Sequence, residues 1–124
     1  MSCARILVAG SVAAAFLLAL GVHADPAGRI VVSDLKPLLQ RAIDAGYARG
    51  VMQGAAAAYV RQKFDTSTAI EIDVRVLHAL PQPGCSRLEV RTRQKDVLEN
   101  GRRADKELRY QVSYCRDGRF PTKE

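Results

Sequence analysis

Two cysteines, Cys85 and Cys115, have the most evident chemistry in this 124-residue chain. Cysteines of an exported protein form disulfides, because compartments outside the cytosol are oxidising. Metal binding by two isolated cysteines 30 residues apart is disfavoured, since structural zinc sites use closely spaced pairs. We therefore expect one disulfide, Cys85–Cys115, and neither a metal nor another cofactor.

Catalytic chemistry has few candidate residues. His23 belongs to an N-terminal segment that we expect to be removed, which leaves His78 as the single histidine of the mature chain. No G-x-S-x-G nucleophile motif, phosphate-binding glycine loop or H-E-x-x-H motif occurs. His78 continues an apolar strand pattern, so a histidine at the edge of the core is favoured over a general base. A two-carboxylate glycoside hydrolase needs no such motif, but the small size disfavours it. We predict that the protein is not an enzyme.

A cluster of basic residues is the main candidate for binding a partner. Its members are Arg91, Arg93, Lys95, Arg102, Arg103 and Lys106. The apolar alternation stops beyond Thr92, so this region is either an extended two-stranded arm or a disordered loop. Tyr110, the only aromatic residue nearby, has the parity of a core residue. Acidic residues are interleaved with the basic ones, which favours a solvated charged hairpin over a nucleic-acid reader.

The N-terminal segment has the parts of a secretion signal. Arg5 supplies the positive charge, and an uninterrupted apolar run follows over residues 6–22. The length of the run would allow a retained anchor, but the Val-His-Ala end favours cleavage after Ala24. We expect residues 1–24 to be a cleavable signal peptide of the general secretion route. The mature chain would be a single periplasmic domain, residues 25–124, without a transmembrane segment.

The net charge of the mature chain limits the classes of molecule that it is expected to bind. Removal of the signal takes one of the 19 basic residues and none of the 13 acidic ones, so the mature net charge is +5, from 18 basic and 13 acidic residues. For an exported protein this balance fits anionic lipid, lipopolysaccharide, transported DNA or an acidic face of another envelope protein. General solubility is the alternative explanation.

The first half of the mature chain has helical spacing. Ser33 or Asp34 can cap a helix, Pro37 fits its first turn, and apolar residues recur on one face. On a helix, the small residues that follow would form a smooth strip, which favours close packing on a sheet over an oligomer interface. One helix over residues 34–64 and two helices divided near Gly46 both fit the pattern. The small residues recur every fourth position, at Gly46, Gly50, Gly54 and Ala58.

The second half has the alternation of strands. Apolar and polar residues alternate near 68–80, 85–98 and 102–115, and Pro83-Gly84 suits a turn. We predict an α+β fold with one disulfide. The N-terminal helix or helix pair would pack on a three-stranded antiparallel β-meander.

The last two predicted strands have a defined register. Residues 99–101 suit a three-residue hairpin loop, which would pair Leu98 with Arg102. The numbers of paired residues then sum to 200, so Cys85 lies opposite Cys115. The cysteines thus support the register independently of the turn.

The segment from Pro83 to Pro121 has a further pattern. Pro-Gly-Cys-Ser-Arg-Leu opens one strand, and Tyr-Cys-Arg-Asp-Gly-Arg-Phe-Pro closes the last. In these residues the chain resembles small exported accessory proteins of conjugative transfer and type IV secretion. The resemblance carries no catalytic signature and implies an accessory role in a transfer apparatus.

Together these features predict a non-catalytic periplasmic binding or assembly protein, an accessory component of a conjugative or type IV secretion apparatus. Its partner would be another envelope protein, bound through the charged hairpin and the wet face of the sheet. The leading alternative is an inhibitor or immunity-type protein that inserts the loop Pro81–Gly84 into another envelope enzyme. A third possibility is binding of DNA or anionic lipid through the same arginines, with a steep loss of affinity in salt.

Overall fold

The computed structural model describes residues 28–123 of the chain. The expected signal peptide, residues 1–24, lies outside the described residues. No helix within the described part is long and apolar enough to cross a membrane.

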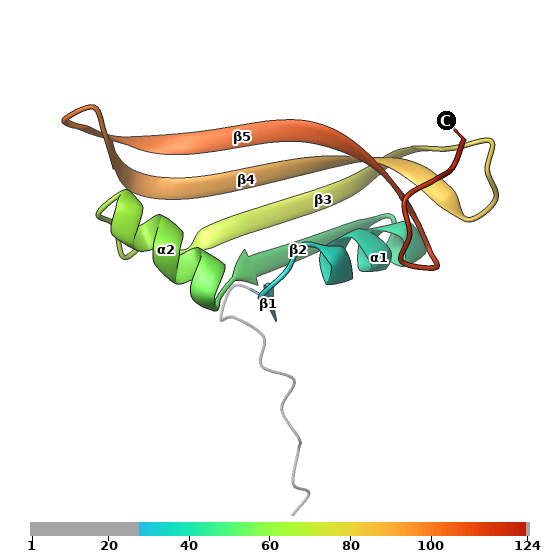
Figure 1. Cartoon of the computed structure of the whole chain (residues 1–124), viewed down its shortest axis with the longest axis horizontal. Helices are drawn as coiled ribbons and strands as arrows, with labels where there is room; N and C mark the ends of the chain where they lie inside the picture. The colour runs from blue at the N-terminus through green and yellow to red at the C-terminus, as the bar shows by residue number, and fades with distance from the viewer. Residues whose placement is uncertain (1–27, 124) are drawn as a thin grey trace, which may run out of the picture.

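A five-stranded mixed sheet and two helices make up the described part (Figure 1). The sheet order follows the chain: β1 (Ile30–Val32), β2 (Tyr47–Met52), β3 (Ile70–Ala79), β4 (Cys85–Glu99) and β5 (Arg102–Cys115). Helix α1 (Lys36–Ala45) joins the parallel strands β1 and β2, and helix α2 (Ala55–Lys63) precedes β3. The other strand pairs are antiparallel. The predicted α+β class is confirmed. The three-stranded antiparallel meander is wrong, because β1 and β2 extend the sheet to five strands with one parallel pair.

The region expected to be helical over residues 34–64 contains a strand. α1 ends at Gly46, whose φ of 92° is left-handed, and β2 follows directly. The single-helix alternative is therefore wrong. Of the two-helix alternative, the end of the first helix at Gly46 is confirmed, but the second helix begins at Ala55 rather than near Ala48. Gly50 explains the geometry, because a Cβ there would lie 2.6 Å from Cδ1 of Leu38 on α1. Only glycine lets the helix approach β2 so closely. The small residues do permit close helix–sheet packing, but Gly50 does so from the sheet side.

α1 has the amphipathic pattern that the sequence predicts. Pro37 lies in its first turn. The N-cap is Leu35 rather than the expected Ser33 or Asp34, although the Asp34 carboxylate accepts a hydrogen bond from the N–H of Lys36 at 3.0 Å. The buried face of the helix packs on the sheet, and Ala57 of α2 joins the same core. The wholly or almost wholly buried members of this core include Leu38, Leu39, Ala42, Ala57, Ile72, Val74, Leu88, Val90 and Tyr114.

The turn between β4 and β5 is shorter than predicted. Asn100 and Gly101 form a two-residue loop, and both have a positive φ, of 52° and 74°. Such a pair is typical of a type I′ hairpin turn. Leu98 therefore pairs with Arg103, one position away from the expected Arg102.

A β-bulge between Gln94 and Val97 compensates for this offset. From Gln94 opposite Lys106 the ladder continues without a shift to Cys85 opposite Cys115. The predicted pairing of the cysteines is confirmed, because the short turn and the bulge displace the register by one residue each in opposite directions.

A second register shift, in the pairing of β3 with β4, places His78 on the opposite face of the sheet from the one predicted. The shift lies between Val76 and His78, so His78 pairs with Arg87 and is exposed. The extra residue, Leu77, reverses the alternation of the strand. The expectation that His78 lies at the edge of the core is therefore wrong.

Candidate binding surfaces

The sheet has one face covered by helices and one face that neither helix covers. Side chains of α1 and α2 share a single apolar core with the first face, the covered face. The second face, here called the open face, has six arginines and four carboxylates. They are Arg49, Glu71, Asp73, Arg75, Arg87, Glu89, Arg91, Arg93, Glu107 and Arg109. The open face is therefore polar, with an excess of positive charge.

Ion pairs on the open face form both between neighbouring strands and along β5. Arg75 donates a hydrogen bond to Glu89 at 3.0 Å, and Arg109 donates one to Glu107 at 2.6 Å. Arg91 lies 3.2 Å from the same Glu107 carboxylate. The hydrogen bond from Arg75 lowers the pKa of Glu89, and the hydrogen bond from Arg109 lowers the pKa of Glu107. Both hydrogen bonds therefore favour the charged form of the carboxylate.

Arg29 is the one arginine of the described residues that is almost fully buried, with 2% of its surface exposed. Its guanidinium lies 2.8 Å from Asp73 and 3.4 Å from Glu71, and it also donates to the backbone oxygens of Gly50 and Ile72. Arg29 thus ties the start of β1 to β2 and β3. Its role is structural rather than one of surface recognition.

Tyr47 stands among arginines on the open face. Its side chain is 63% exposed, and it lines a depression of about 530 Å³. Four arginines and two carboxylates line the same depression, namely Arg49, Arg75, Arg91, Arg109, Asp73 and Glu89. Sequence reasoning missed Tyr47, because it assigned residue 47 to a helix. The alternation of large and small residues over 47–50 was the available signal for a strand.

Four residues of the predicted basic cluster lie around a second depression, of about 450 Å³. They are Arg91, Arg93, Lys95 and Lys106. Three carboxylates line the same depression, those of Glu71, Asp105 and Glu107, so its charge is nearly balanced.

Ion pairs occupy most of the predicted basic cluster. Arg93 lies 2.9 Å from Asp73, and Lys106 lies 3.4 Å from Glu99. Arg91, as described above, pairs with Glu107. Lys95 and Arg102 are exposed, and neither has an ion pair within the described part of the chain.

The far end of the β4–β5 hairpin is an extended arm rather than a loop. The hydroxyl of Thr68 donates to the Lys95 carbonyl at 2.7 Å, and the Leu98 N–H donates to the Phe64 carbonyl at 2.9 Å. Arg103 lies 2.8 Å from the Asp65 carboxylate. The segment after α2 therefore holds the arm in place. It also brings Arg103, but not Arg102, against an acidic partner.

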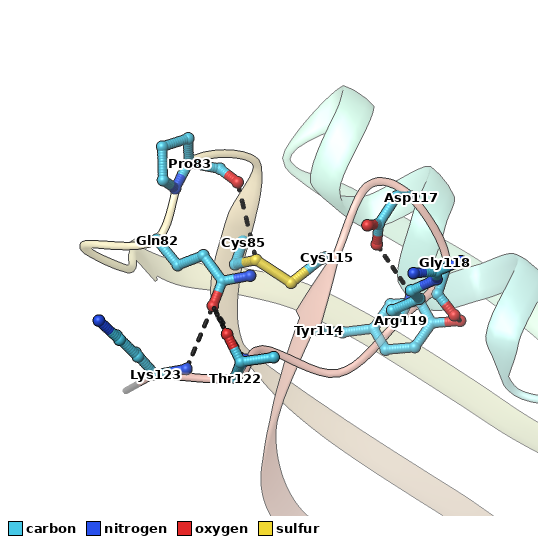
Figure 2. Close-up of a disulfide and its surroundings, with 10 residues drawn as sticks. All are labelled: Gln82, Pro83, Cys85, Tyr114, Cys115, Asp117, Gly118, Arg119, Thr122 and Lys123. Atoms are coloured by element: carbon cyan, nitrogen blue, oxygen red, sulfur yellow. Dashed lines mark hydrogen bonds between the residues drawn. A yellow bond between two sulfur atoms is a disulfide. The ribbon is translucent and has the colours of Figure 1, made fainter.

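The opposite end of the hairpin carries the disulfide (Figure 2). Cys85 and Cys115 close a loop with a sequence separation of 30, for which about 3–4 kcal/mol of stabilisation is typical. The C-terminal segment folds back beside the loop Pro81–Gly84. There, the Gln82 side-chain oxygen accepts hydrogen bonds from the N–H groups of Thr122, at 2.9 Å, and Lys123, at 3.2 Å. The loop is thus braced by a covalent bond and by the chain end.

Known proteins offer no further guide to these surfaces. No family model, curated protein or solved structure matches the chain. The resemblance of residues 83–121 to secretion accessory proteins therefore stays a prediction. Among residues 28–123, no group of three or more His, Cys, Asp or Glu side chains is placed to hold a metal.

Proposed function

We propose that this protein is a non-catalytic binding protein of the bacterial periplasm, and that it captures another envelope protein through the open face of its sheet. The observation that carries the proposal is Tyr47, exposed among Arg49, Arg75, Arg91 and Arg109 on a face that no helix covers. Tyrosine and arginine are, with tryptophan, the residues most enriched among those that dominate the energetics of protein interfaces.

The arginines of this depression differ in how firmly they are held. Arg49 is 52% exposed and lies 3.7 Å from its nearest carboxylate, on Asp73. Arg75 is also exposed, although it donates to Glu89. Arg49 can therefore pair with a carboxylate of a partner without breaking a short ion pair. The excess of arginine favours a partner with an acidic patch, because complementary charge speeds association and excludes basic surfaces.

The proposed periplasmic location is supported by the disulfide and the N-terminal segment rather than by the open face. The disulfide fits an oxidising compartment, and the N-terminal pattern fits export. The apparatus to which the partner belongs would be a conjugative or type IV secretion system. That last step depends on the resemblance of residues 83–121 alone.

A crosslinking experiment tests the proposal. The mature chain is incubated with periplasmic extract, and captured proteins are identified by mass spectrometry and then titrated as purified proteins. The test variant is Arg49→Glu/Arg75→Glu. The control is Lys95→Glu/Arg102→Glu, which makes the same charge change at exposed residues of the arm. We expect the first pair to weaken binding about tenfold or more and the control to change it less than about twofold.

The same experiment distinguishes the other surfaces. Loss of capture by the control alone would contradict the proposal and assign binding to the arm. A steep fall in affinity with salt, together with binding to DNA or anionic vesicles, would overturn it in favour of a general anion binder. Retention of full affinity by both variants would also overturn it.

The braced loop Pro81–Gly84 supports a second candidate function, inhibition of another envelope enzyme. Rigid loops bind with little loss of conformational entropy. Here the disulfide and the Gln82 hydrogen bonds to the chain end provide that rigidity. Replacement of Pro81 and Pro83 by alanine should weaken capture of an enzyme and leave the folded state intact. The open-face variant should bind that enzyme normally under this alternative.

A further inference from the structure

β5 is a long edge strand with an unpaired side. It spans Arg102–Cys115 and pairs only with β4 among the described strands. Cys115 donates its N–H to the Arg119 carbonyl rather than to β4. Hydrogen-bonding direction alternates along an antiparallel strand, so the odd-numbered residues Glu107, Arg109 and Gln111 direct their N–H and C=O groups outward. A second strand can bind to this row of groups.

The charged residues of β5 disfavour pairing with most other strands, but they are complementary to those of a second β5 in antiparallel orientation. In an antiparallel pair of two β5 strands, outward-directed residues must face each other. A pair centred on Leu108 places Glu107 opposite the partner's Arg109, and Arg109 opposite the partner's Glu107. Opposite charges in such positions stabilise a strand pair.

Neighbouring registers lack this complementarity. A pair centred on residue 107 places Glu107 against the partner's Glu107, and a pair centred on residue 109 places Arg109 against the partner's Arg109. Like charges directly opposite destabilise the pair. A pair centred on Tyr110 moves Arg109 opposite Gln111 and loses both ion pairs. The order of charges therefore selects the register centred on Leu108.

Apolar side chains on the other side of β5 support the same register. Leu108 is 61% exposed and Tyr110 is 40% exposed, although both have the parity of the covered face. In the pair centred on Leu108, the two Leu108 side chains meet at the axis. Tyr110 lies opposite the partner's Lys106, whose aliphatic stem can cover part of the ring. Association would thus bury apolar surface that α1 and α2 leave uncovered.

We propose that two copies of this protein associate through antiparallel β5 strands centred on Leu108. The result is one continuous sheet of ten strands. Because paired residues of an antiparallel sheet point to the same side, the two open faces form one continuous surface. This inference does not depend on the proposed function, since β5 association needs neither Tyr47 nor Arg49.

Charge exchange between two variants tests the proposal. Sedimentation velocity of the mature wild type at up to about 100 µM should show the mass of two chains, since a dimer with a micromolar Kd is populated there. Glu107→Arg alone and Arg109→Glu alone should each be monomeric, because like charges then face each other across the axis. An equimolar mixture of the two variants should recover the dimer mass, since opposite charges face each other again.

Two further measurements keep the test decisive. Circular dichroism shows whether each variant is folded. Gln111→Pro removes an outward N–H that β4 does not use, so it should give a folded monomer. A monomeric wild type at the highest concentration would overturn the proposal. So would dimers of either charge variant alone, or a mixture of folded variants that stays monomeric.

Discussion

The two faces of the sheet differ in what holds them together. The covered face is apolar, and Leu38 of α1 is fully buried against it, with 0% exposure. The open face carries alternating arginines and carboxylates, most of them partly exposed. Burial of apolar surface contributes far more free energy than exposed ion pairs do. The covered face therefore stabilises the fold, whereas the side chains of the open face are under fewer packing constraints and are available for the proposed partner.

Arg29 differs from the other charged residues that contact the open-face carboxylates. It contacts two open-face carboxylates but is itself almost fully buried. A buried charge without partners is costly, so removal of one partner is destabilising even where the intact pair adds little. Arg29 therefore behaves in energetic terms like a residue of the covered face.

The largest effect should come from the covered face. Leu38→Ala removes a fully buried side chain that packs on Gly50, and we expect a loss of roughly 4 kcal/mol in the free energy of unfolding. Urea denaturation measures it. Tyr59→Ala on α2, where the side chain is exposed, should cost less than about 0.5 kcal/mol. Equal effects of the two substitutions would contradict the assignment of one core beneath α1.

An intermediate effect should come from the buried arginine. Arg29→Met should lower the free energy of unfolding by about 3 kcal/mol, because the buried Gly50 and Ile72 carbonyls lose their donor and Asp73 loses a 2.8 Å contact. Arg49→Met is the matched control. It removes a longer, exposed contact with the same Asp73 carboxylate and should cost less than about 1 kcal/mol. A small effect of Arg29→Met would contradict the conclusion that the buried Arg29 stabilises the contact of β1 with β2 and β3.

The smallest effect should come from acid titration of the open face. The pKa values of Glu89 and Glu107 are lowered from 4.5 by hydrogen bonds from Arg75 and Arg109. A lowered folded-state pKa means that the stabilisation is present above the unfolded-state value and is lost as the pH falls through the folded-state pKa. Stability should therefore decline below pH 4.5.

Glu107→Gln isolates this contribution. The variant should show a flatter pH dependence below pH 4.5, with little change between pH 6 and 8, outside the range where the carboxylate titrates. Thermal unfolding at a series of pH values measures it. An unchanged slope would indicate that the Arg109 contact contributes nothing to stability.

The sequence pattern predicted β3, β4 and β5 but neither β1 nor β2. In the three long strands, apolar and charged residues alternate over many positions, so the period of two is unambiguous. β2 has six residues, and its inward positions include Ala48 and Gly50. Small residues carry little hydrophobic signal, and their spacing of four imitates a helix. The Tyr47 depression was missed for the same reason, because it forms only when β2 pairs with β3.

By itself, the sequence determined the α+β class, the amphipathic helix α1 and the pairing of Cys85 with Cys115. These features depend on local periodicity and on the covalent chemistry of two residues, which a linear pattern can express. Only the tertiary structure decided which charges share the open face, that Tyr47 joins them, and that Arg29 is buried. Those outcomes depend on packing between segments distant in the chain, where Gly50 lets α1 approach the sheet and a bulge restores the hairpin register.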